Sequence, residues 1–199
     1  MKADAIDQAK FRLIRAEKAL TALGAAKVIE DAEAAWTDFL VAAATIYSKL
    51  EQGAKGSGKC EGWYGRKKKA RKDDQLLKYL HFARNSNEHG IERVVATSAA
   101  NFHRGRQLAF NERIPVKIHA VDQATMLPIE GESAEGVIAG PTIRPVRAHD
   151  RRYNDYCDPP TEHLGRPINF GGNFCYEVGL LGLDYLRGLI QEAEGLEPH

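Results

Sequence analysis

A dense group of polar side chains ends an otherwise apolar stretch at residues 84–89, where the sequence runs Arg-Asn-Ser-Asn-Glu-His. A histidine exchanges a proton near neutral pH, and an arginine offers a planar fork of donors that matches phosphate oxygens. On an ideal helix Arg84 and His89 lie about 140° apart, whereas Asn85 and His89 share one face. If the helix tightens or ends near Gly90, His89 can turn toward Arg84 with the Asn85 amide close enough to orient it. The spacing therefore permits a phosphate site, and the alternative is that both cations only favour the negative end of the helix dipole.

A second group that could contact phosphate is a run of basic residues shortly before this polar group. Its members are Arg66, Lys67, Lys68, Lys69, Arg71 and Lys72. Cationic clusters of this kind hold a nucleic-acid backbone, so the run is a candidate RNA-binding surface. A solvated face at the start of a helix is the alternative interpretation. Residues 51–60 are rich in glycine and nearly free of apolar side chains, so we expect a flexible connection there and the basic run in the loop that follows.

Other polar clusters give weaker signals. Residues 103–106 and 149–152 are basic clusters that we expect on solvated loops, with RNA contact as the alternative. No metal is expected, because the acidic and histidine residues near the Pro159-Pro160 break lack a regular ligand spacing. Those residues are Asp155, Asp158, Glu162 and His163. The Gly171-Gly172 pair lacks the remainder of a phosphate-binding loop, and we expect no cofactor.

Amphipathic helices must position these side chains. Apolar residues recur at steps of three and four over residues 3–23, 31–51, 73–89 and 175–194, which predicts four helices. The polar group lies at the end of the third. Because three amphipathic helices would leave an apolar face uncovered, we expect the last helix to complete a four-helix bundle. The predicted fold class is mainly α, with residues 1–199 forming a single domain.

The segment between the third and fourth predicted helices differs in character. Residues 94–174 contain seven of the eight prolines, and residues 114–120 alternate between apolar and polar side chains as a half-buried strand does. Short strands are also predicted at 137–139 and 142–144. The sequence therefore predicts a small β-containing insertion within the bundle.

Composition restricts the class of protein. The chain has 199 residues, 43% of them hydrophobic, with 28 Lys and Arg against 27 Asp and Glu. These values exclude a disordered chain and argue against a globally basic DNA-coating protein. The acidic N-terminus is unlike a signal peptide, no apolar run approaches the roughly 20 residues of a membrane span, and the three cysteines show no disulfide or zinc spacing. We expect a cytoplasmic protein without a membrane partner.

Residues 84–89 resemble the signature of the HEPN superfamily (higher eukaryotes and prokaryotes nucleotide-binding). In that signature an Arg and a polar residue are followed by three variable positions and a His. The superfamily is a bundle of four to five helices with this motif near the end of the third long helix, which is where Arg84 to His89 lie. Residues 159–167 and 182–186 resemble the ending of bacterial HEPN-type proteins of unknown function that carry a β-rich segment before the last helix. The likeness covers the predicted helices, a little over half of the chain.

The resemblance implies a metal-independent endoribonuclease of the kind found in toxin–antitoxin and phage-defence systems. His89 would act as general acid or base at the 2′-hydroxyl, Arg84 would stabilise charge on the phosphorane, and Asn85 would orient them, giving a 2′,3′-cyclic phosphate and a 5′-hydroxyl. It also implies a homodimer through the motif helix, RNA or a nucleotide as ligand, and an antitoxin as a partner. Ile91 stands where some of these toxins have a modified Tyr, so regulation by that route is not expected. The alternative is a non-catalytic HEPN-fold protein that binds RNA or a nucleotide, or has a structural role.

Overall fold

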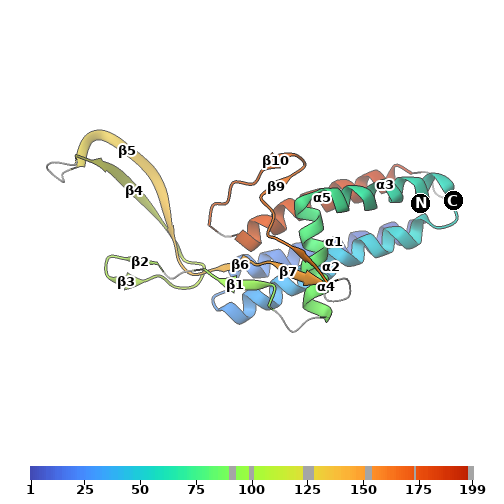
Figure 1. Cartoon of the computed structure of the whole chain (residues 1–199), viewed down its shortest axis with the longest axis horizontal. Helices are drawn as coiled ribbons and strands as arrows, with labels where there is room; N and C mark the ends of the chain where they lie inside the picture. The colour runs from blue at the N-terminus through green and yellow to red at the C-terminus, as the bar shows by residue number, and fades with distance from the viewer. Residues whose placement is uncertain (90–92, 99–100, 123–127, 151–153, 173, 197–199) are drawn as a thin grey trace.

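The protein is mainly helical, with a central region of small two-stranded sheets (Figure 1). The computed structural model describes residues 1–89, 93–98, 101–122, 128–150, 154–172 and 174–196. Within these residues the five helices are α1 (Ala3–Ala25), α2 (Ile29–Ala54), α3 (Gly58–Asp73), α4 (Gln75–His89) and α5 (Phe174–Glu194). The strands between α4 and α5 are β1 (Val95–Thr97), β2 (Phe102–His103), β3 (Arg106–Gln107), β4 (Arg113–Val121), β5 (Pro128–Ala139), β6 (Ile143–Pro145), β7 (Ala148–Asp150), β8 (Asp155–Cys157), β9 (Glu162–His163) and β10 (Arg166–Pro167).

Helix α2 is at the centre of the bundle, because it contacts all four other helices. It packs most extensively against α1, and α5 lies against both, while α4 runs across the long helices (Figure 1). The large side chains of α2 that this arrangement buries include Trp36, Phe39 and Ile46. Gly182 lets α5 approach α4 closely, since a Cβ atom there would lie 2.7 Å from Leu80 Cδ1. The four predicted helical segments are confirmed, with ends that differ by a few residues.

A fifth helix replaces the predicted flexible connection, so two predictions are wrong: the loop over residues 51–60 and the bundle of only four helices. Helix α2 continues to Ala54, and α3 begins at Gly58 after Ser57, whose hydroxyl accepts a bond from Cys60 N. Only three side chains of α3 are buried, Cys60, Trp63 and Tyr64. With so few apolar positions and several glycines, α3 shows no apolar stripe, and its contacts with α2, α4 and α5 hold it in place instead.

The described residues of the inserted segment form five antiparallel two-stranded sheets, β1–β6, β2–β3, β4–β5, β7–β8 and β9–β10. The predicted strand at 114–120 is confirmed as part of β4, which pairs with β5 in a register that sets Lys117 opposite Glu135. The predicted strands on either side of Gly140-Pro141 exist but do not pair with each other, since β6 pairs with β1 instead. The β4–β5 hairpin projects away from the helices (Figure 1).

Strands β7, β8 and β9 pack against α4, and the segments beside them hold its first turn and its middle. At the first turn Asp74 accepts bonds from the backbone of Leu77 at 2.9 Å and of Leu164 at 2.7 Å, and its Oδ1 lies 3.0 Å from His163 Nδ1. Burial opposes ionisation of Asp74, yet these donors hold the pKa of its carboxyl below the usual value. Further along α4, Tyr79 Oη lies 2.8 Å from the carbonyl of Val146. The insertion is therefore part of the environment of the motif helix.

In the part of the chain that the structure describes, no helix combines the length and apolar character that crossing a membrane requires.

Candidate functional site

The side chains of interest lie on the last two turns of α4. Its apolar residues Leu76, Leu77, Leu80 and Ala83 are buried against the bundle. His81, Arg84 and Asn85, spaced by three and four residues, therefore share another face of the helix. Strand β7 packs against α4 and brings Asp150 to this face. We call His81, Arg84, Asn85 and Asp150 the α4 polar cluster.

Asn85 is at the centre of the α4 polar cluster. Its Oδ1 accepts a hydrogen bond from Arg84 Nη1 at 3.2 Å. Its Nδ2 donates to Asp150 Oδ2 at 3.2 Å and lies 3.5 Å from His81 Nε2. Asp150 is buried and the other three residues are half-buried. The Asp150 carboxylate thus holds the Asn85 amide so that its oxygen faces the guanidinium.

Burial and nearby cations both act on His81 of the α4 polar cluster. Burial, followed by the positive charges of Arg71, Arg84 and Lys68, lowers the pKa of His81 to about 4. Asp150 acts in the opposite direction. His81 is therefore neutral near pH 7, and cations from both α3 and α4 act on the same point. Such a field favours an anion such as a phosphate group.

The structure brings together two of the three residues that the sequence predicts for catalysis, Arg84 and Asn85. His89 is the last residue of α4, and its side chain, like Gly90, lies outside the described residues. The expected approach of His89 to Arg84 stays a prediction. The same holds for the catalytic roles of all three.

The basic run lies on helix α3 rather than in a loop. Most of its charges have partners within the chain: Lys67 contacts Glu192 at 2.6 Å, Lys68 contacts Glu51 at 3.5 Å and Lys69 contacts Asp73 at 2.5 Å. Arg71 lies over the Tyr47 ring at 4.5 Å. Among the described residues Arg66 and Lys72 form no ion pair, and both are exposed. RNA binding by this run stays a prediction, and Arg71 and Lys68 are the members that act on the α4 polar cluster.

Sequence reasoning missed His81 and misplaced Asp150. His81 precedes Arg84 and Asn85 by three and four positions, so the helical spacing that pairs Asn85 with His89 could have identified it. Asp150 comes from β7, 65 positions from Asn85, and no local pattern connects the two. The expectation of a solvated loop at 149–152 is wrong for His149 and Asp150, which lie in β7, and residues 151–153 are outside the described part.

No cluster of three or more His, Cys, Asp or Glu side chains that could hold a metal ion occurs among the described residues. His163 and Asp74 form a pair at the start of α4 instead. Each of their side chains is about one-tenth exposed, and together they join the β9 segment to the α3–α4 junction. This pair connects two parts of the fold, and it lies at the opposite end of α4 from the α4 polar cluster.

The fold and the α4 polar cluster define a helical-bundle protein with an electropositive polar site near the end of its fourth helix. No model of a protein family, no curated protein and no solved structure matches the chain.

Proposed function

We propose that the protein is a HEPN-like, metal-independent endoribonuclease that acts through Arg84 and His89. The observation that carries the proposal is the placement of two arginines at the polar face of the motif helix: Arg84 Nη1 donates to Asn85 Oδ1, and Arg71 of α3 lines the same hollow as His81. A phosphodiester is the anion that such a face would receive in an RNA-cleaving protein. A role as a toxin or phage-defence effector, controlled by an antitoxin, is part of the same proposal.

The reaction needs a base, an acid and a stabiliser of negative charge. His89 would take the proton of the 2′-hydroxyl as its oxygen attacks phosphorus, and the 5′-oxygen would leave with a proton from the same or a second motif. Arg84 would donate hydrogen bonds to the phosphorane oxygens. Asn85 and Asp150 are positioning residues, because Asn85 Oδ1 holds Arg84 Nη1 and Asp150 holds the Asn85 amide.

A second function, a non-catalytic protein in which the motif residues have a structural role, is favoured by Asp150. This buried carboxylate belongs to the chain's own insertion and lies at the motif, where it partly offsets the positive field. A phosphate entering the site would meet its repulsion. This arrangement suits a non-catalytic site, in which Arg84 is held in place, better than a catalytic site that cleaves RNA.

The test is digestion of a mixed RNA substrate in the presence of a chelator, with the product ends identified. The wild type is expected to leave 2′,3′-cyclic phosphate ends, and Arg84→Ala or His89→Ala to lower the rate by about a hundred-fold or more. Matched controls are Arg166→Ala on β10 and His119→Ala on β4, which are exposed and distant from α4 in the chain, and both should retain activity.

Two other results decide against the assignment. Cleavage that survives both Arg84→Ala and His89→Ala would contradict it, because another site would then carry the reaction. Tight binding of RNA with no product in any condition would favour the non-catalytic function. Circular dichroism spectra of each variant must match the wild type before the rates are compared.

A further inference from the structure

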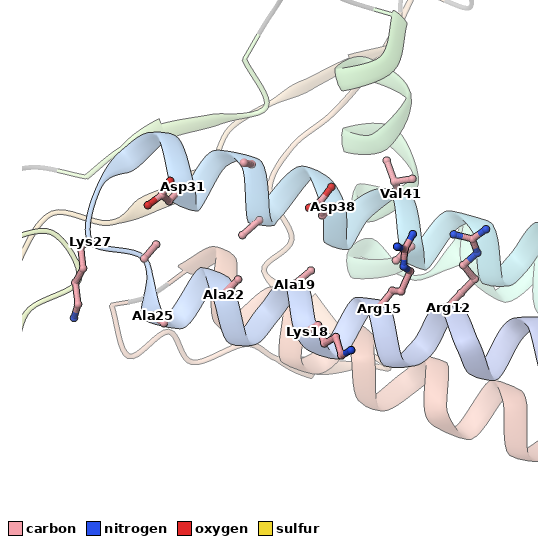
Figure 2. A pocket seen from close by; sticks show the side chains of 14 residues that line it. Arg12, Arg15, Lys18, Ala19, Ala22, Ala25, Lys27, Asp31, Asp38 and Val41 are labelled. Carbon is pink, nitrogen blue, oxygen red and sulfur yellow. The ribbon is translucent and has the colours of Figure 1, made fainter.

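An open groove of about 740 Å³ runs between α1 and α2 (Figure 2). Half of its 14 lining residues are alanines, among them Ala19 and Ala22 of α1 and Ala35 of α2. Short side chains along two adjacent helices let a facing pair of helices approach closely. The groove is thus shaped to receive a helical surface.

The two sides of the groove carry opposite charges. Arg12, Arg15 and Lys18 line it from α1, and Asp31 and Asp38 line it from α2 (Figure 2). Within the described ranges none of these five side chains forms an ion pair. Other charges of α1 are neutralised inside the chain, as when Glu17 contacts Arg187 of α5 at 2.8 Å. Unpaired charges therefore gather at the groove.

Exposed apolar side chains adjoin the charges. Phe11 is 56% exposed, Ile14 is 49% exposed, and both stand beside Arg12 and Arg15 on α1. Val41 of α2 lines the groove and is also exposed. A surface with apolar groups among charges of both signs suits a protein partner. It does not suit a nucleic acid, because Asp31 and Asp38 would repel phosphates.

We propose that a second copy of this chain docks in this groove, with α1 of each copy lying over α2 of the other. The argument is charge complementarity under two-fold symmetry, since such an interface must complement itself. Helices α1 and α2 run in opposite directions from the turn at Lys27. Arg15 lies 12 positions before Lys27 and Asp38 lies 11 positions after it, so the two are at nearly the same level along the helices.

A two-fold axis parallel to the helices then brings Arg15 of each copy to the partner's Asp38. The other two-fold arrangement places α1 on α1 and sets Arg12, Arg15 and Lys18 against identical charges, which repel. The charges therefore select one of the two arrangements. The alanines allow the helices to approach, and Phe11, Ile14 and Val41 supply apolar area at the contact.

The inferred interface goes beyond the proposed nuclease and differs from a dimer through the motif helix. It is formed by α1 and α2, not by α4. Ala34 and Asp38 line both the groove and an adjoining hollow that contains Asn87 of α4. The docked copy would therefore border the motif end of α4 without covering the start of that helix.

The experiment is sedimentation velocity on the full chain, whose monomer mass is 22.0 kDa. We expect a dimer whose Kd rises about ten-fold or more with Arg15→Glu, and with Asp38→Lys, because each sets like charges against each other. The double variant Arg15→Glu with Asp38→Lys reverses both charges and should restore the wild-type Kd. Ala22→Trp, at an exposed position of the groove, should also abolish the dimer. Arg166→Glu, on exposed β10, is the matched control and should change nothing.

Three outcomes would overturn the inference. The first is a wild type that stays monomeric up to about 0.1 mM, and the second is a dimer that neither Arg15→Glu nor Ala22→Trp weakens. The third outcome is a double variant that has a native circular dichroism spectrum but does not restore the dimer. If the dimer is disrupted only by substitutions on α4, such as Asn87→Arg, the interface belongs to the motif helix instead. RNA cleavage is measured separately on the same variants, so loss of the dimer and loss of the nuclease are distinguishable.

Discussion

The helical bundle and the β4–β5 hairpin are stabilised in opposite ways. In the bundle, Trp36 and Ile46 are fully buried and each helix contacts at least two others. In the hairpin, Ile118 and Val137 are more than half exposed, and the extensive contacts of β4 are with β5. An isolated two-stranded hairpin is marginal in water. The difference indicates that apolar burial stabilises the bundle, whereas a backbone ladder maintains the hairpin.

The largest effect should come from truncating the bundle core. Trp36→Ala removes a fully buried side chain that stacks on Phe39 at 5.5 Å between ring centroids, so the free energy of unfolding should fall by about 3–5 kcal/mol. Val137→Ala on the hairpin should change it by less than about 0.5 kcal/mol. Urea denaturation followed by circular dichroism measures both. Equal losses would refute the contrast between the two regions.

Close helix contacts should give the next largest effect. Gly182→Val places methyl groups where α5 meets Leu80 and Phe39, and overpacking there should cost about 1–3 kcal/mol. Gly188→Val is the matched control on the same helix, because nothing lies within 4 Å of the added Cβ atom. Its effect should stay within about 0.5 kcal/mol. Thermal unfolding compares the two, and a stable Gly182→Val variant would show that α5 can move away from α4.

The pH dependence of stability should distinguish the bundle from the hairpin through His81. His81 has a pKa of about 4 in the folded protein, against roughly 6.5 in an unfolded chain. The unfolded chain alone binds this proton between those values, so the stability present above pH 6.5 falls as the pH drops toward 4. Because His81 is partly exposed, the change should be on the order of 1 kcal/mol.

His81→Gln should remove this part of the pH slope. Val137→Ala, on the exposed hairpin, removes no titratable group and should leave the slope as in the wild type. Chemical denaturation at several pH values between 4 and 7.5 measures it. An unchanged slope in His81→Gln would mean that His81 is not held neutral by the bundle.

The smallest effect should come from shortening the hairpin. Residues 118–134 can be replaced by Asn-Gly, which forms a tight turn between Lys117 and Glu135, opposite each other in the register. The unfolding free energy should change by less than about 0.5 kcal/mol if the hairpin adds no burial to the bundle. A large loss measured by denaturation would show that the hairpin supports the core.

Local patterns predicted most of the fold. The steps of three and four in α1, α2, α4 and α5 identified these helices because one face of each is buried. The alternation at 114–120 identified β4 for the corresponding reason. Helix α3 could not be found in this way, since it buries three side chains and otherwise carries charge that pairs with neighbouring elements, as Lys67 does with Glu192.

The sequence predicted only two of the four residues of the α4 polar cluster. Arg84 and Asn85 are adjacent residues of one helix, so their proximity needs nothing beyond helical geometry. The pairing of Asn85 with Asp150 depends on β7 returning to α4. The lowered pKa of His81 depends on its burial in the fold and on Arg71 and Lys68 of α3. The groove could likewise not be predicted from the sequence, because its positive and negative side chains face each other only when α1 and α2 pack side by side.

The sequence by itself determined the helical segments other than α3, the place of the polar motif at the end of one of them, and the strand-forming character of the insertion, because these follow from periodicity within a few turns. Tertiary structure alone decided that Asp150 orients Asn85, that α3 adds positive charge to the site, and that oppositely charged rims face each other across the α1–α2 groove. Each of these is a contact between side chains far apart in the chain. Their energies depend on distance and burial, which only the packed fold sets.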